Sequence, residues 1–301
     1  MSGDTMRKTV ERPLSPQLCH RVRHEDTFPV EWRPLAGEAR FAVRALWPDD
    51  HPFFTPLDRG GRRCHDPLLV AETLRQATMA LLHAAHGMPL SRHILLSELS
   101  LTCDPAGLAV TGGAADMEIR FAELLRRGGE LAVMRAEWTV RRTARLVATG
   151  TAHARFAGPA AYRRLRGGRV EPGVARPGPE SRRAPAARTG RTRTEDVLLA
   201  PRDRDGTWPL VVDTGHPTLF QRPNDHIPGM VVLEAARQAA AATVWPRPFL
   251  PAALRIVFHR YAEFQGGPCL LGAEPGRTPG TVRVTGHQDG EPVFSCALSD
   301  G

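Results

Sequence analysis

The chain has 301 residues, of which 42% are hydrophobic, and a formal net charge of +8. This length suits two domains of ordinary size, each with its own core. No apolar run approaches the roughly 20 residues that a membrane span requires. The polar start MSGDTMRKTV is not typical of a signal peptide, so we expect a cytoplasmic protein that does not enter a membrane.

The positive charge is concentrated in one segment. Residues 155–193 contain eleven Arg and two acidic residues, and they are rich in Pro, Gly and Ala. Such a composition indicates a flexible linker. It either attracts an acidic partner or nucleic acid, or is a solvated tether. Because Phe156 and Tyr162 are the only aromatic residues among these arginines, too few for a base-stacking platform, and no zinc-finger spacing occurs, no nucleic-acid partner is expected.

The linker divides the chain into comparable halves. The predicted parts are a flexible leader at 1–17, a first domain at 18–157, the linker at 158–194 and a second domain at 195–301.

In the first half, a strand ending in a turn is predicted at 41–54. A helix follows over 66–87, where Asp66 suits the N-cap, Pro67 the first turn and Gly87 the end. Apolar and alternating segments then predict antiparallel strands. These segments are 93–103, 108–124 and 130–156.

The second half repeats this order. A strand and turn are predicted at 208–220, followed by a helix at 229–245 that Pro246 and Pro248 prevent from continuing. Short strands are predicted at 254–264, 268–275, 280–288 and 291–298. A helix followed by several strands, twice, indicates an α+β protein with one long helix packed on each antiparallel sheet.

Both predicted helices contain the signature Glu-x-x-Arg-Gln inside an apolar run. The six residues are Glu72, Arg75, Gln76, Glu234, Arg237 and Gln238. A spacing of three places each Glu and Arg on one helix face, where they form an ion pair or bind a shared ligand. A buried carboxylate must be paired, hydrogen-bonded or protonated. The recurrence favours a functional site, with an internal salt bridge as the alternative.

Several motifs in a fixed order carry a family resemblance. PGMVVLEAARQ looks like the helix start of hotdog-fold dehydratases and thioesterases. The order HPFF, DPLLVAETLRQ, VVDTGHPTLF, NDHIPGMVVLEAARQ and VTGHQDGEPVF resembles the A-factor biosynthesis family, the γ-butyrolactone signal synthases of filamentous actinobacteria. The resemblance implies a double hotdog, with two long central helices each packed on a curled antiparallel β-sheet.

The same resemblance implies an activity and its partners. A β-ketoacyl group would pass from an acyl carrier protein, or from acyl-CoA, to a hydroxyl of dihydroxyacetone phosphate. The ester would then lead to a butenolide phosphate, the precursor of a γ-butyrolactone signal. The alternatives are a hotdog thioesterase or dehydratase acting on acyl thioesters, and a non-catalytic regulator that binds an acyl ligand.

Acyl transfer to an alcohol needs a base, a group that stabilises an oxyanion and a clamp for the phosphate. Glu234 is the best candidate for the base, because an apolar helix environment is expected to raise the pKa of its carboxyl group. Glu72 either holds this role in the first half or supports it structurally. Arg237 and Arg75 are predicted to fix the phosphate or to orient the adjacent glutamate.

The start of the second helix is the predicted oxyanion site. The N–H groups near Gly229 and Met230 lie in a first turn, which has unsatisfied donors and the positive end of the helix dipole. Pro67 replaces this donor in the first half, so we expect the chemistry at the second helix. Gln76 and Gln238 complete the two signatures and are predicted to bind substrate.

Three histidines precede the helices. One of His51, His216 and His226 is predicted to act as an acid, a base or a carbonyl polariser, and a structural hydrogen bond is the alternative for each. His226 is grouped with the catalytic residues. His51, His216 and Asp225 are grouped with the substrate-binding residues.

One motif departs from the family pattern. Phe-Asp-His-Pro is expected before the second helix, but this chain has Phe220, Gln221, Arg222 and Pro223. If the missing pair takes part in the chemistry, its loss affects activity or substrate choice.

No cofactor or metal is expected, because no Gly-rich phosphate loop and no His/Cys ligand spacing occur. The five cysteines are scattered and are predicted to be reduced and structural. A homodimer is compatible with these features.

Overall fold

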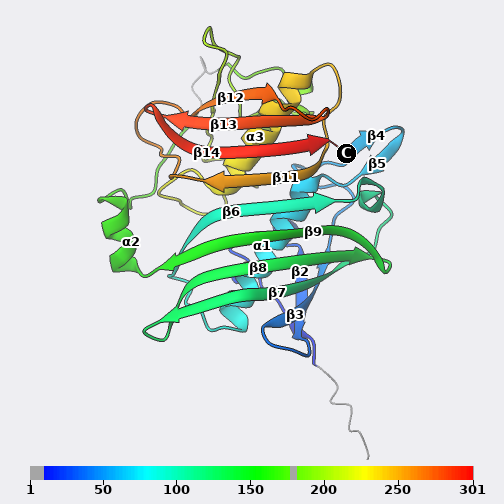
Figure 1. Cartoon of the computed structure of the whole chain (residues 1–301), viewed down its shortest axis with the longest axis vertical. Helices are drawn as coiled ribbons and strands as arrows, with labels where there is room; N and C mark the ends of the chain where they lie inside the picture. The colour runs from blue at the N-terminus through cyan, green and yellow to red at the C-terminus, as the bar shows by residue number, and fades with distance from the viewer. Residues whose placement is uncertain (1–9, 177–181, 301) are drawn as a thin grey trace, which may run out of the picture.

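The computed structural model describes residues 10–176 and 182–300. Residues 1–9 of the predicted leader and 177–181 of the predicted linker lie outside the described residues. The main feature is a twelve-stranded sheet in the order β1-β2-β3-β7-β8-β9-β6-β11-β14-β13-β12-β10. Helices α1 (Pro67–Ala84) and α3 (Gly229–Val244) lie behind this sheet in Figure 1.

The first half of the sheet is built around hairpins of long strands. Its members are β1 (Arg12–Pro13), β2 (Pro29–Pro34), β3 (Arg40–Leu46), β6 (His93–Cys103), β7 (Ala114–Arg127), β8 (Glu130–Arg142) and β9 (Arg145–Ala157). The predicted strand at 93–103 coincides with β6. The predicted segment 130–156 is the β8–β9 hairpin, whose turn residues Thr143 and Ala144 have positive φ. A separate hairpin pairs β4 (Leu57–Arg59) with β5 (Arg62–Cys64).

The second half is shorter. Its strands are β10 (Trp208–Pro209), β11 (Pro251–Phe258), β12 (Leu270–Pro275), β13 (Thr281–Gln288) and β14 (Glu291–Asp300). The strand and turn predicted at 208–220 are observed as the two-residue strand β10, a bridge at Leu210 and turns around His216. In the last of these turns the His216 ring accepts the backbone N–H groups of Thr218 and Leu219.

The two long helices agree closely with the predicted ranges. The Asp66 carboxylate accepts a hydrogen bond from the Leu68 N–H and so caps α1, whereas Pro228 at the start of α3 gives no side-chain cap. In α1, every residue except Arg75 and Ala84 is buried. A helix that is buried on nearly all sides belongs to a core. No described helix is long and apolar enough to cross a membrane.

The two halves meet at a seam between β6 and β11. These strands pair antiparallel from Ala253 opposite Thr102 to Val257 opposite Glu98. The two predicted sheets are therefore one, because each edge strand satisfies the hydrogen-bonding groups of the other.

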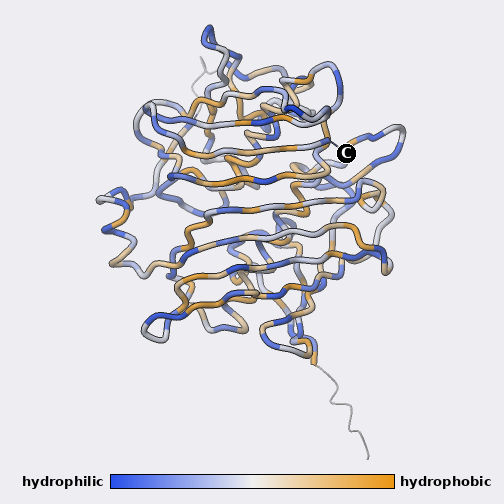
Figure 2. Tube along the Cα trace, in the orientation of Figure 1, coloured by the Kyte–Doolittle hydropathy of each residue, from blue (hydrophilic) through white to orange (hydrophobic). Residues whose placement is uncertain are grey.

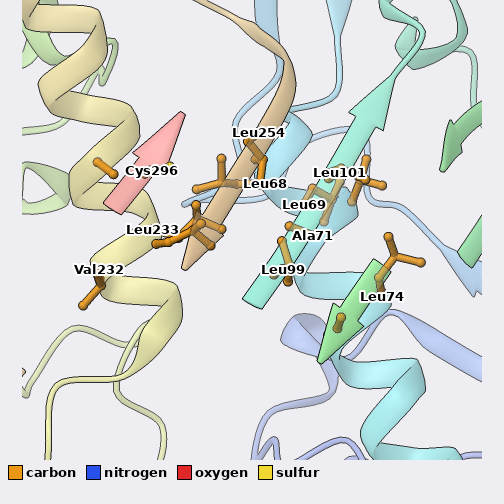
Figure 3. Packing of buried hydrophobic residues seen from close by; sticks show 14 of the residues in the cluster. Leu68, Leu69, Ala71, Leu74, Leu99, Leu101, Val232, Leu233, Leu254 and Cys296 are labelled. Atoms are coloured by element: carbon orange, nitrogen blue, oxygen red, sulfur yellow. The ribbon is translucent and has the colours of Figure 1, made fainter. Parts of the chain in front are cut away.

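The hydrophobic core is continuous across the seam. Figure 3 shows Leu99 and Leu101 of β6 near Leu69 of α1, and Leu254 of β11 near Leu233 of α3. In Figure 2, apolar positions recur along the strands, and hydrophilic residues are frequent in the loops at the sheet ends. All five cysteines are buried and free, as predicted.

Part of the predicted linker belongs to the folded structure. It contains α2 (Pro159–Arg166), which stands at one end of the sheet in Figure 1. Tyr162 and Arg166 of this helix are buried, as is Arg191 further along. The Arg166 guanidinium donates to both carboxylate oxygens of Glu263, at 2.5 and 2.7 Å. These buried residues do not belong to a solvated tether. The domain boundaries stay a prediction.

Candidate functional site

The first signature forms a buried ion cluster. The Glu72 carboxylate accepts from Arg75 Nε at 2.8 Å, Arg21 Nε at 3.0 Å and Gln76 Nε2 at 2.7 Å. Burial raises the pKa of Glu72, but the charges of Arg21 and Arg75 outweigh it and hold that pKa well below its usual value. Glu72 is therefore an ionised carboxylate with its acceptor oxygens in use.

The second signature repeats this arrangement. Glu234 accepts from Arg237 Nε at 2.9 Å, Arg191 Nε at 2.7 Å and Gln238 Nε2 at 2.6 Å. The predicted upward shift of the Glu234 pKa is wrong. Burial does raise it, but Arg191 and Arg237 lower it further, so that the net shift is downward. The second cation beside Glu234 thus comes from Arg191 in a distant segment, and the apolar pattern of the helix alone does not reveal it.

The two glutamines attach the preceding segments to the helices. Gln76 donates to the Asp26 carbonyl at 2.7 Å and accepts from the Phe28 N–H at 3.0 Å. Gln238 makes the same two contacts, to the Asp196 carbonyl and from the Leu198 N–H, both at 2.8 Å. Both side chains are fully buried, and their polar atoms contact protein rather than open space.

His51 and His216 are also a repeated pair. Their Nε2 atoms lie 3.0 Å from Asp26 and 3.1 Å from Asp196 respectively. The Nδ1 atom of each accepts two backbone N–H groups of the following turn. With every ring nitrogen in use and both rings buried, the geometry favours the structural alternative for these two histidines.

A cavity of about 910 Å³ spans the seam between the halves. One wall is apolar and is formed by Ile94, Leu96, Met134, Trp138, Val232 and Phe258. Of the predicted site residues, the cavity brings together Arg75, His226, Gly229 and Met230. The lining does not include the other predicted residues, namely Glu72, Gln76, His51, His216, Asp225, Glu234, Arg237 and Gln238.

His226 is a titratable residue that lines the cavity just before α3. Its Nδ1 atom lies 2.7 Å from Asp225 Oδ1, and Tyr162 donates to Asp225 Oδ2 at 2.8 Å. Burial raises the pKa of Asp225, but the hydrogen bonds from His226 and Tyr162 outweigh it and lower that pKa to about 2. The Asp225 carboxylate thus fixes one ring nitrogen of His226, whose side chain is 25% exposed.

The start of α3 faces the same space. Gly229 and Met230 line the cavity, and no side chain caps this helix end. A Cβ atom at Gly229 would lie 3.3 Å from the Phe258 ring, tighter than ordinary contact. The predicted oxyanion donors are therefore near the His226 ring, and glycine keeps the backbone accessible to a ligand.

The departure from the family motif also borders the cavity, because Gln221 and Arg222 are among its lining residues. Gln221 Oε1 accepts from the N–H groups of Val22 and Arg23, at 3.1 and 3.3 Å. Arg222 lines the cavity together with Arg21 and Arg75. The substituted pair thus fixes the loop to the N-terminal segment and adds a cation to the cavity.

Sequence reasoning missed Arg21 and Arg191, which complete the two ion clusters. Both begin the repeated pattern Arg-x-Arg-x-Glu-Asp, at 21–26 and 191–196. This repeat was the available signal, but 191–196 overlaps the segment interpreted as a linker. Tyr162 was missed as well, because it lies in the same segment. No group of His, Cys, Asp and Glu in the described ranges has the arrangement of a metal site.

Comparisons with known proteins agree with this architecture. The model of the A-factor biosynthesis hotdog domain matches residues 4–158 and 175–263. The 2-oxo-3-(phosphooxy)propyl 3-oxoalkanoate synthase of Streptomyces coelicolor is 51% identical over 293 residues, which cover 95% of this chain and 91% of the relative. The synthase of the same name from Streptomyces virginiae is 42% identical, with 97% and 98% of the two chains covered.

Solved structures share the fold at low identity. An acyl-ACP thioesterase from Bacteroides thetaiotaomicron has a TM-score of 0.50 and 10% identity, with 88% of this chain and 98% of that chain covered. The dehydratase domain from the CurF module of curacin polyketide synthase has a TM-score of 0.50 and 12% identity, with 93% and 99% covered. The predicted hotdog fold is confirmed.

Proposed function

Since the chain belongs to the A-factor biosynthesis hotdog family, we propose that it transfers a 3-oxoacyl group from a thioester to a hydroxyl of dihydroxyacetone phosphate. The name of its relatives describes the ester that this reaction forms. The observation that carries the proposal is the cavity at the seam. It combines an apolar wall for an acyl chain with His226, the open start of α3 and a group of arginines.

In the proposed reaction, Nε2 of His226 removes the proton from the acceptor hydroxyl. The alkoxide oxygen attacks the thioester carbonyl carbon, and the resulting oxyanion is stabilised by the N–H groups of Gly229 and Met230. The C–S bond then breaks, and the thiolate takes the proton from His226. Asp225 holds the imidazole ring in the tautomer that presents Nε2 to the substrate.

Glu72 and Glu234 have a supporting role in this proposal. Both carboxylates are ionised and saturated with donors, so each holds its arginine and glutamine in place rather than accepting a proton from substrate. Arg237 is likewise fully buried and fixes Glu234. Each long helix with its half of the sheet forms one hotdog unit in this view, with the site between the units.

The acyl donor is proposed to be a β-ketoacyl carrier protein or the corresponding CoA thioester in the cytoplasm. The 3-oxoacyl ester has an activated methylene between two carbonyl groups. Attack of that carbon on the ketone of the acceptor, followed by loss of water, would give the butenolide phosphate. This closure requires no group beyond those of the ester itself.

The test is an incubation of the purified protein with a 3-oxoacyl thioester and dihydroxyacetone phosphate, followed by mass spectrometry. We expect an acylated phosphate ester or butenolide phosphate from the parent protein. His226→Asn should lower its rate of formation by roughly 10²-fold or more. Free acid as the sole product would instead support a thioesterase, and tight acyl binding without turnover would support a ligand-binding regulator.

A further inference from the structure

The two ion clusters are related by the internal repeat, but they differ in the number of positive charges that no carboxyl group balances. In the second cluster, Arg191 and Arg237 face two carboxyl groups, Glu234 and Asp66, and Arg191 Nη1 lies 3.5 Å from Asp66 Oδ2. All four side chains are at most 2% exposed. This cluster is closed, and no solute reaches it.

The first cluster has one carboxyl group fewer and is open to the cavity. Arg21 and Arg75 share the single carboxylate of Glu72. Pro228 occupies the helix position that corresponds to Asp66, so no second carboxyl group is supplied there. The Arg75 side chain is 25% exposed and lines the cavity with Arg21.

Arg222 adds a third guanidinium to this cluster. The loop that carries it is fixed to the N-terminal segment, because Arg21 Nη1 donates to the Thr218 carbonyl at 2.9 Å. Arg222 lines the same cavity as Arg21 and Arg75, and partial burial and then the charge of Arg75 lower the pKa of Arg222. The described residues provide no carboxylate for an ion pair with Arg222. Six residues after His51, at the position equivalent to Arg222, stands the neutral Leu57.

Three guanidiniums against one carboxylate leave two positive charges at the wall of the cavity. The neighbouring His20 does not add to them at neutral pH, since burial and then Arg222 and Arg75 lower its pKa to about 3. Guanidinium groups bind phosphate oxygens with paired hydrogen bonds. A phosphate monoester near neutral pH carries close to two negative charges, which matches the excess.

We propose that Arg21, Arg75 and Arg222 form the subsite for the phosphate monoester of the acceptor, with Arg222 as the residue that distinguishes phosphorylated from unphosphorylated acceptors. This assignment rests on the proposed function for the identity of the acceptor. Glu72 positions Arg21 and Arg75 and leaves their remaining N–H groups for the ligand. The phosphodiester of a pantetheine arm carries a single negative charge and balances only half of the excess.

Arg222→Gln is the informative variant, because Arg222 is exposed and its loss leaves the buried ion pairs intact. The donor is the 3-oxoacyl thioester of N-acetylcysteamine, which has no phosphate. We expect KM for dihydroxyacetone phosphate to rise about ten-fold or more, with a smaller change in kcat. With unphosphorylated dihydroxyacetone, the parent and the variant should react at equal rates.

Arg164→Gln is the control, since Arg164 is an exposed arginine of α2 that does not line the cavity. Its KM for dihydroxyacetone phosphate should stay within about two-fold of the parent value. If Arg222→Gln slows the reaction equally with both acceptors, the assignment to the acceptor phosphate is wrong. The assignment is also wrong if the variant raises KM for a CoA thioester donor instead.

A direct titration separates this proposal from the proposed function. Isothermal calorimetry with inorganic phosphate should give binding in the parent that Arg222→Gln weakens about ten-fold and Arg164→Gln does not. Such binding without any ester formation would retain the phosphate site and reject the synthase. Ester formation with an unaltered phosphate affinity in Arg222→Gln would retain the synthase and reject the site.

Discussion

Glu234 is a fully buried carboxylate whose charge is opposed by Arg191 and Arg237. Glu234→Ala removes the anion and leaves both guanidiniums buried. We expect the free energy of unfolding to fall by about 3–5 kcal/mol, measured by urea denaturation. Glu25 is the control, because it is 56% exposed and paired with a surface arginine. A loss of less than 1 kcal/mol in Glu234→Ala would contradict the role of this ion cluster.

The same carboxylates predict how stability depends on pH. The pKa values of Glu72 and Glu234 are lowered from 4.5 to about 2 in the folded protein. The unfolded chain therefore binds more protons, and the contribution to stability is complete above about pH 4.5 and is lost as the pH falls towards 2. Urea unfolding between pH 2.5 and 6 should show this decline. Glu234→Gln, which has one such group fewer, should show a shallower slope over the same range.

At the scale of single residues, the sequence predicted which residues form the two signatures but not the protonation state of their glutamates. The pairing of Glu72 with Arg75 follows from helix spacing and is observed. The decisive second cation comes from Arg21, 51 residues earlier, and helix periodicity carries no information on such a distant partner. Of the three candidate histidines, His226 was already grouped with the catalytic residues, and it is the one of the three that lines the cavity.

Among the elements, α2 connects the interdomain segment to the site. Tyr162 donates to the Asp225 carboxylate that holds His226. Tyr162→Phe should lower kcat by about ten-fold or less, while the thermal midpoint changes little. Arg164→Gln on the exposed side of α2 is the control and should leave kcat unchanged. An unaltered kcat in Tyr162→Phe would show that this hydrogen bond does not support the reaction.

The segment around α2 also shows where prediction from composition fails. The elements α1, α3 and β6 could be predicted from the sequence because their apolar residues are continuous or periodic. In α2, the sequence PAAYRRLR has few apolar residues, and Arg166 is buried only because Glu263 and Asp225 oppose it.

A solvated linker would tolerate deletion of residues 155–193. We instead expect that deletion to abolish folding, because it removes both Arg166 and Arg191. Circular dichroism and solubility of the deletion variant would test this expectation. A folded and active deletion variant would contradict the structural role of the segment.

On the scale of the whole molecule, the seam joins the halves by backbone and side-chain contacts. Besides the pairing of β6 with β11, Arg21 donates to the Thr218 carbonyl and Arg191 donates to the Phe53 carbonyl. Residues 1–157 expressed alone should aggregate, since β6 becomes an open edge. Co-expression with residues 158–301 should restore a soluble complex, checked by size-exclusion chromatography. A stable, monomeric first half would contradict this dependence.

The seam already joins the two halves of the sheet inside a single chain. A second copy is not needed to complete the sheet, and the predicted homodimer stays a prediction that light scattering tests. The large-scale order of helix and strands was predictable because the repeat is visible in the sequence. The fusion of the two sheets was not, since strand pairing between halves depends on edges that local patterns do not identify.

The difference between the closed and the open ion cluster has a consequence for stoichiometry. A symmetric pair of hotdog units would hold two equivalent reaction centres, but here only one cluster borders the cavity. The first half of the chain supplies the open ion cluster and the second half supplies His226 and the start of α3, so one cavity uses side chains of both halves. Each polypeptide should therefore bind one acyl donor and one acceptor at a time, and its two halves should turn over as a single centre.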